Sequence, residues 1–355
     1  MESPPPKRNV GHGGEDGISA LPDHLLLDIL ERLDLREAVR TGALSTRWRH
    51  LPSHLSRVHL DVAHFGGATP LEVMDAFTGA VRALLTRVPP AEGVCGSSAL
   101  KSTLKIDVPC SELQELEFTG FRCARIELVS VPKLRQVVCQ HWPFENPPVR
   151  FGYVPELRGV MLYSKAKAGQ EPFALSDCLP RSARNLSTLT LCFGDQMIWI
   201  QPEHPKQLTP IFRNLTTVFL FGIFSECDLS WTLFILEAAP ALQNFALSRH
   251  SCIKTPEYSA EKTNVVWEPS KDLKHLNLKG LHIFGCEDED KVRNYIRLVM
   301  ERAVGLLIIE LYGENPCIYC DATNLERSKA EKASRHRIKE QLTHGSSSSV
   351  EIIIC

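Results

Sequence analysis

The chain has 355 residues, of which 43% are hydrophobic and 23% charged, and its formal net charge is −2. This is the composition of an ordinary globular protein, and the length allows two domains or one small module with an elongated array. The near-neutral charge gives no reason to expect a nucleic-acid partner, and no apolar run approaches the roughly 18 residues of a membrane span.

Residues 1–16 are rich in proline and glycine and are expected to form a disordered tail. They lack the apolar core of a secretory signal, so we expect an intracellular protein of the cytoplasm, the nucleus or both. In such a reducing compartment most of the twelve cysteines are expected to be buried free thiols. The pair Cys317 and Cys320, even with His336 and His344, is a weak zinc signal, and no metal or other cofactor is expected.

Three short helices are predicted between residues 17 and 60. The apolar residues of the first recur with helical spacing and are Leu21, Leu25, Leu26, Ile29, Leu30 and Leu33. Pro22 and Asp23 suit the first turn of that helix. Asp34 with Glu37 resembles a capping box for a second helix, and a third from Ser45 would carry Trp48 and Leu51 on one face.

The apolar surplus of these helices points to a docking face. A unit of about 40 residues rarely buries enough surface to be stable alone, and an exposed apolar patch usually marks an interaction site. The alternative is that Leu25, Ile29 and Trp48 pack only against the rest of the same chain.

Two segments carry a resemblance to a known family. Residues 21–30, Leu-Pro-Asp-His-Leu-Leu-Leu-Asp-Ile-Leu, and residues 43–49, Ala-Leu-Ser-Thr-Arg-Trp-Arg, resemble the F-box of many plant proteins. This resemblance implies docking to a Skp-type adaptor and, through it, to a cullin scaffold in an SCF ubiquitin ligase. The residues that match F-box positions of the core or the adaptor contact are Leu21, Pro22, Leu25, Ile29, Leu30, Val39, Leu44, Trp48 and Leu51.

The rest of the chain contains a recurring pattern of the form L-x-x-Φ-x-Φ, in which Φ is apolar. It follows a predicted strand at 58–62, a helix at 71–88 and a strand at 104–108. Seven copies begin at Leu113, Leu134, Leu157, Leu186, Leu215, Leu242 and Leu273. Their spacing is close to the roughly 20–29 residues of a leucine-rich repeat, in which each unit supplies one strand to a stacked parallel sheet.

The x positions of the copies are expected to project from the concave face of this array. They are polar and of mixed charge, which suits protein recognition better than a hydrophobic ligand. The residues proposed to bind a target protein are Arg135, Arg158, Thr188, Thr217, Asn244 and His275. The alternative is that these side chains are simply solvated.

The last segment differs from the repeats. An acidic run at 287–290 precedes an amphipathic helical pattern, and a buried strand is predicted at 306–311. This order resembles the FBD-type region that closes some plant F-box/leucine-rich-repeat proteins and would cap the array. Residues 325–342 predict a basic helix, which would be solvated or touch phosphate, and residues 350–354 a last strand.

The expected fold is therefore α/β, with a three-helix F-box, an irregular leucine-rich-repeat solenoid and a C-terminal helix-strand cap. The expected boundaries are 1–16 for the tail, 17–60 for the F-box, 61–285 for the solenoid and 286–355 for the cap with its basic segment.

No catalytic motif accompanies this architecture. The sequence contains no Gly-x-Ser-x-Gly, His-Glu-x-x-His or Walker lysine pattern, so a non-catalytic binding protein is expected. The leading hypothesis is a substrate receptor of an SCF ligase with a target protein that the sequence does not identify. One alternative is a leucine-rich-repeat scaffold or inhibitor outside any ligase. Another is a small-ligand co-receptor, for which the candidate face supplies no arginine cluster.

Overall fold

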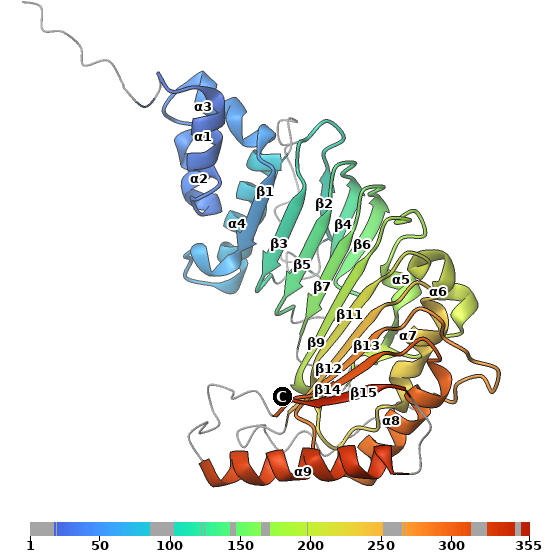
Figure 1. Cartoon of the computed structure of the whole chain (residues 1–355). Helices are drawn as coiled ribbons and strands as arrows, with labels where there is room; N and C mark the ends of the chain where they lie inside the picture. Colours follow the sequence, from blue (N-terminus) through green and yellow to red (C-terminus); the bar gives the residue numbers. More distant parts are fainter. Residues whose placement is uncertain are drawn as a thin grey trace, which may run out of the picture.

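The computed structural model describes residues 18, 20–85, 103–121, 123, 125–142, 147–164, 171–196, 198–250, 265, 267–313, 325–344 and 349–355. In these residues a helical N-terminal unit is followed by a strand-rich region, so the predicted mixed α/β class is confirmed (Figure 1). The expected tail at 1–16 and the pair Cys317 and Cys320 lie outside the described residues.

The three predicted N-terminal helices are present as α1 (Asp23–Leu30), α2 (Leu35–Thr41) and α3 (Thr46–His50), and a 3-10 turn at Leu51–His54 follows them. Pro22 is the residue before α1. The side chain of Asp34 accepts a hydrogen bond from the backbone N of Glu37 at 2.8 Å, and Ser45 accepts one from Trp48 at 3.3 Å. These two caps satisfy donors that a helix start leaves open, which explains where α2 and α3 begin.

Helix α4 (Pro70–Leu85) joins the helical unit to the sheet. Its buried residues Met74, Phe77 and Val81 recur at helical spacing. The ring of Phe77 meets that of Phe65 edge to face at 5.6 Å between centroids. The apolar side of α4 therefore packs inward, and the helix contacts α2, the 3-10 turn at Leu51–His54 and the strand at Thr103–Asp107.

One parallel sheet of ten strands runs through most of the molecule. Its spatial order is β1-β3-β5-β7-β9-β11-β12-β13-β14-β15, and each neighbouring pair is parallel. The strands are β1 (Arg57–Asp61), β3 (Glu115–Thr119), β5 (Gln136–Gln140), β7 (Gly159–Tyr163), β9 (Thr188–Gln196), β11 (Thr217–Phe224), β12 (Asn244–His250), β13 (Gly280–Phe284), β14 (Ile308–Leu311) and β15 (Glu351–Ile354). The sheet crosses both expected boundaries, at 60/61 and 285/286.

A second layer carries the chain back between the strands of this main sheet. It begins with a parallel three-stranded sheet of β2 (Thr103–Asp107), β4 (Arg125–Ser130) and β6 (Val149–Tyr153). It continues with the short pair β8 (Phe173–Ala174) and β10 (Ile200–Gln201), and then with α5 (Leu175–Cys178), α6 (Pro205–Phe212), α7 (Leu233–Ala238) and α8 (Asp290–Arg302). The hydrophobic core lies between the two layers and is continuous from α1 to β15.

Six of the seven L-x-x-Φ-x-Φ copies lead into strands of the main sheet, but the copy at Leu273 does not. The strand there is β13, which belongs to the overlapping frame Leu278-Lys-Gly-Leu281-His-Ile283. Residues 273–278 form the turn before it, and Leu276 is 65% exposed. The seventh predicted copy was therefore placed five residues too early.

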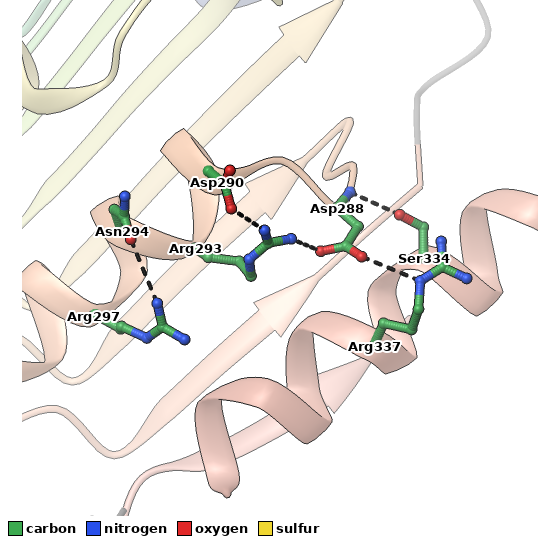
Figure 2. A network of polar contacts seen from close by, with 7 residues as sticks. All are labelled: Asp288, Asp290, Arg293, Asn294, Arg297, Ser334 and Arg337. Carbon is green, nitrogen blue, oxygen red and sulfur yellow. Dashed lines mark hydrogen bonds and ion pairs between the residues drawn. The ribbon is translucent and has the colours of Figure 1, made fainter.

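The predicted basic helix is α9 (Leu325–Thr343), and its second half packs against the protein. Ile338 and Leu342 are buried. Figure 2 shows Asp288 at the centre of the junction: its backbone N donates to Ser334 Oγ at 2.7 Å, and its carboxylate accepts from Arg337 at 3.1 Å and from Arg293. Part of the positive charge of α9 is thus used to dock the helix, rather than being wholly solvated.

Candidate functional site

The structure divides the nine predicted F-box residues into core and surface. Leu30, Trp48 and Leu51 are at most 4% exposed and form the core of the helical unit, while Leu21 and Val39 are half-buried. Pro22, Leu25, Ile29 and Leu44 are exposed, the last to 65%. Sequence spacing could not make this division.

Helix α1 is apolar on two sides. Leu26 and Leu30, four residues apart, are buried, whereas Leu25 and Ile29 are 42% and 37% exposed. Since residues i and i+4 share one face of a helix, the second pair forms a separate outward stripe. The helical unit also exposes Ile18 and Leu44, and we call these four residues together the apolar F-box face.

Arg47 connects the two helices that carry the apolar F-box face. Arg47 of α3 donates through its Nε to Asp23 at 2.8 Å and through its Nη2 to the carbonyl oxygen of Leu21 at 2.6 Å. The start of α1 is thereby fixed to the start of α3, two residues from Leu44. The exposed apolar residues therefore stand on a preorganised support, which lowers the entropic cost of binding.

Glu31 ties the helical unit to the main sheet. Its carboxylate accepts from the hydroxyl and the backbone N of Ser56, at 2.6 and 3.1 Å, and from Arg57 at 3.0 Å. Burial alone would raise the pKa of Glu31, but these hydrogen bonds and the charge of Arg57 outweigh it and lower the pKa below 4.5. The contact fixes the end of α1 against the start of β1.

The second candidate surface is the face of the main sheet that points away from the core. Thr188, Thr217 and Asn244 lie side by side in register on β9, β11 and β12. Arg135 and Arg158 are exposed in the turns that enter β5 and β7. The structure therefore brings these five predicted residues to one face and its edge.

His275 is the exception, because it is 3% exposed and lies outside the strands. Its Nδ1 accepts from the backbone N of Leu278 at 3.0 Å, so its Nε2 carries the proton and donates to the carbonyl oxygen of Ala239 at 2.9 Å. Burial lowers the pKa of His275 and favours this neutral form. The prediction that His275 belongs to the exposed face is wrong: it holds the turn before β13.

Aromatic residues on the same sheet face escaped the sequence analysis. Phe219 and Phe221 stack with centroids 5.8 Å apart on β11, and Phe284 stacks on Tyr312 at 4.3 Å. All four are half-buried. Strand alternation could have predicted their position. In L-x-x-Φ-x-Φ, the residue between the two apolar positions and the residue after the second one point to the same side of the sheet as the outward x residue before the first.

Next to the second stack, three polar groups converge. His282 Nδ1 donates to Glu310 Oε2 at 2.6 Å, and the hydroxyl of Tyr312 donates to the same oxygen at 2.7 Å. The hydrogen bond from Tyr312 is the largest cause that lowers the pKa of Glu310, and His282 adds to it. The contacts within this cluster are hydrogen bonds and ring stacking, and Tyr312 also interacts with the exposed Cys355.

The cysteines that the structure describes are free thiols. Cys123, Cys139, Cys178 and Cys286 are buried, as expected, while Cys110 and Cys355 are exposed. Burial raises the pKa of Cys178 and of Cys286 to about 12, which makes both poor thiolate donors. Among the described residues no group of three or more His, Cys, Asp or Glu side chains could hold a metal ion.

Comparison with known protein families bears on the first candidate surface. The F-box domain model matches residues 18–59. This segment contains the three helices and the apolar F-box face, so the N-terminal helical unit is an F-box domain. No helix in the described part of the chain is long and apolar enough to cross a membrane.

Several plant proteins are similar to the chain. The F-box/FBD/LRR-repeat protein At5g22660 of Arabidopsis thaliana is 45% identical over 60 residues, which are 17% of this chain and 13% of that protein. A second from the same plant, At5g18770, is 52% identical over 52 residues, covering 15% of this chain and 11% of that protein. A third, At1g66290, is 26% identical over 173 residues, covering 40% and 38%. The predicted resemblance to plant F-box/FBD proteins is confirmed, with matches that span only a part of each relative.

Proposed function

We propose that this chain is the substrate-recognition subunit of an SCF-type cullin ubiquitin ligase. The observation that carries the proposal is the apolar F-box face, which exposes Ile18, Leu25, Ile29 and Leu44 on an F-box domain whose other leucines and tryptophan are largely buried. A face of this kind is stabilised by burial against a partner. We assign a Skp-type adaptor as that partner, and the cullin scaffold as the protein to which the adaptor connects.

The main sheet and its return layer serve as a leucine-rich-repeat solenoid in this proposal. Support comes from the L-x-x-Φ-x-Φ pattern, each true copy of which supplies one strand to the parallel sheet. The outward face of the sheet, with Arg135, Arg158, Thr188, Thr217 and Asn244 at its amino end, holds the target protein. The chain supplies no catalytic group; it raises the local concentration of the target near an enzyme bound elsewhere in the complex, in the cytoplasm or nucleus.

Adaptor binding by surface variants is the decisive experiment. The variant Leu25→Asp plus Leu44→Asp places two charges on the apolar F-box face and is expected to weaken binding of a purified Skp-type adaptor about 100-fold or more. Leu71→Asp is the matched control, because Leu71 is exposed on α4, outside that face. Trp48 is unsuitable for the test, since it is 2% exposed and its loss would unfold the domain.

Two results would contradict the proposal. One is unchanged adaptor binding by the folded double variant. The other is no binding by the wild-type chain, which would favour a repeat scaffold or inhibitor outside any ligase. Deleting residues 17–60 is a poorer test, because β1 begins at Arg57 and the deletion removes most of an edge strand.

A further inference from the structure

A second exposed apolar cluster lies at the opposite end of the main sheet from the F-box domain. Leu276, Val304 and Leu307 are 65%, 58% and 61% exposed, in the turns that enter β13 and β14. Three large aliphatic side chains this exposed in adjacent turns are uncommon on a surface that only faces water. We call them the apolar cluster.

The scaffold holds the apolar cluster in place. A Cβ on Gly305 would lie 1.9 Å from the carbonyl oxygen of Leu276, so the two turns touch through their backbones and only glycine fits. The backbone N of His275 also donates to the carbonyl oxygen of Arg302 at 2.7 Å. The buried His275 ring anchors the first turn from inside, so Leu276 is presented outward by a fixed turn.

Basic side chains occupy the same edge of the sheet. Each belongs to a turn that enters a main-sheet strand and each is exposed; together they form what we call the basic rim: Arg158, Arg184, Arg213, Lys274 and Lys279. Nearby acids include the half-buried Glu156, which lies 4.0 Å from Arg158, and the exposed Asp272, Glu301 and Glu351, of which Glu351 begins β15 next to Leu307. The rim therefore keeps a local positive excess on a chain whose net charge is −2.

Asparagines align the turns of this rim. Asn185 donates to the carbonyl oxygen of Pro155 at 3.0 Å, Asn214 to that of Arg184 at 2.6 Å, and Asn277 to that of Pro240 at 2.9 Å. Each bond connects one turn to an earlier one. The basic residues are consequently spaced by the strands themselves, about 4.8 Å for each step across the sheet.

The length of the rim can be compared with that of an extended peptide. From β7, which follows Arg158, to β14, which follows Leu307, the sheet order has five steps, or about 24 Å. An extended chain advances about 3.3 Å per residue, so roughly seven residues would span from the first arginine to the apolar cluster.

We propose that the basic rim and the apolar cluster together form the docking surface for an acidic segment of the target protein. The acidic residues of the segment face the rim, and large apolar side chains at one end cover Leu276, Val304 and Leu307. Charge complementarity selects this occupant, and the apolar contact supplies affinity. The inference rests on the proposed receptor function, because it names the class of target.

Peptide selection tests the inference. A displayed library of random twelve-residue peptides is panned on the purified full-length chain bound to its adaptor, after removal of peptides that bind the adaptor alone. We expect enrichment of peptides that combine acidic residues with leucine, phenylalanine or similar side chains. The affinity of the synthesised peptides is then measured for variants of the full chain.

Two test variants address the two halves of the surface. Arg184→Glu plus Arg213→Glu reverses the charge of the rim, and Leu276→Gln plus Leu307→Gln removes two apolar contacts; each is expected to weaken binding at least about tenfold. Matched controls carry the same kinds of change on the other layer: Lys206→Glu plus Arg297→Glu on α6 and α8, and Val129→Gln plus Tyr153→Gln on β4 and β6. The controls are expected to bind as the wild type does.

Several outcomes would overturn the inference. The first is that the selection enriches no peptides with both acidic and apolar residues. The second is that test and control variants lose peptide affinity equally. The third is that Leu276→Gln plus Leu307→Gln leaves peptide affinity unchanged. Self-association of the wild-type chain that the same variant abolishes would assign the cluster to a second copy instead. Adaptor binding is recorded for each variant, so a failure of the receptor function is detected separately from a failure at the rim.

Discussion

Leu25 and Leu26 are adjacent in sequence but lie on different sides of α1. Leu26 is fully buried beneath the helix, whereas Leu25 is 42% exposed on the apolar F-box face. The helical repeat of 3.6 residues turns neighbouring side chains by about 100°, so one leucine stabilises the domain and the other is available to a partner. Stability and adaptor binding are thus assigned to different residues of the same run.

This division predicts opposite effects of two similar substitutions. Leu26→Ala is expected to lower the free energy of unfolding by about 2–5 kcal/mol, because it leaves a cavity in a closed core. Leu25→Ala is expected to change that free energy by less than about 1 kcal/mol while weakening adaptor binding. Chemical unfolding and an adaptor titration on both variants measure the two effects, and equal destabilisation would contradict the assignment of Leu25 to the surface.

The contact of Glu31 with Ser56 and Arg57 predicts a pH dependence. Because the pKa of Glu31 is lowered in the folded protein, the stability it contributes is present above the unfolded pKa, about 4.5, and is lost as the pH falls through the folded value. Glu31→Gln is expected to cost about 1–2 kcal/mol at pH 7. The difference from the wild type is expected to shrink below about pH 4.

Unfolding titrations of both proteins between pH 3 and pH 7 measure this dependence. Asp28→Asn is a suitable control, since Asp28 is exposed and forms its ion pair with Arg32, four residues away, while its charge acts only weakly on Arg57. A Glu31→Gln effect that is independent of pH would mean that the carboxylate charge does not stabilise the junction.

The helices and strands that the sequence predicted correctly are those that the local spacing of apolar and capping residues specifies. The stripe of α1, the cap Asp34, the start of the third helix near Ser45 and six repeat strands are local patterns, and their outcome depended little on distant contacts. The division of the α1 leucines into core and surface depends instead on where α3 and the 3-10 turn pack, which spacing does not specify.

Near residue 275 two overlapping frames fit the repeat pattern equally well. Leu273 and Leu278 each begin an L-x-x-Φ-x-Φ copy, and the later frame forms the strand because His275 finds buried partners in the turn. The stack of Phe284 on Tyr312 was equally inaccessible, since it joins strands β13 and β14 through their register. Such contacts follow from tertiary packing, which a single sequence pattern does not encode.

The cluster of His282, Glu310 and Tyr312 predicts a measurable titration change. Tyr312→Phe removes the hydroxyl that is the main cause of the lowered pKa of Glu310, while it keeps the ring that stacks on Phe284. The pKa of Glu310 is therefore expected to move up toward its ordinary value of 4.5. NMR titration of the Glu310 carboxyl carbon measures the shift, with Phe284→Leu as the control that disturbs the stack and leaves the hydrogen bond; an unchanged pKa in Tyr312→Phe would exclude the hydroxyl as its cause.

Two glycine substitutions test whether the turns of the apolar cluster are held rigidly. Gly305→Ala would put a Cβ 1.9 Å from the backbone oxygen of Leu276, so the turns must separate, and we expect a loss of about 2 kcal/mol or more in the free energy of unfolding. Gly79→Ala is the matched control: Gly79 lies inside α4, its Cβ would meet no atom within 4 Å, and alanine is expected to add up to about 1 kcal/mol through helix propensity. Chemical unfolding compares the two variants with the wild type. If both stabilise the protein, the turn at Gly305 is free to move, and the apolar cluster is not a preformed surface.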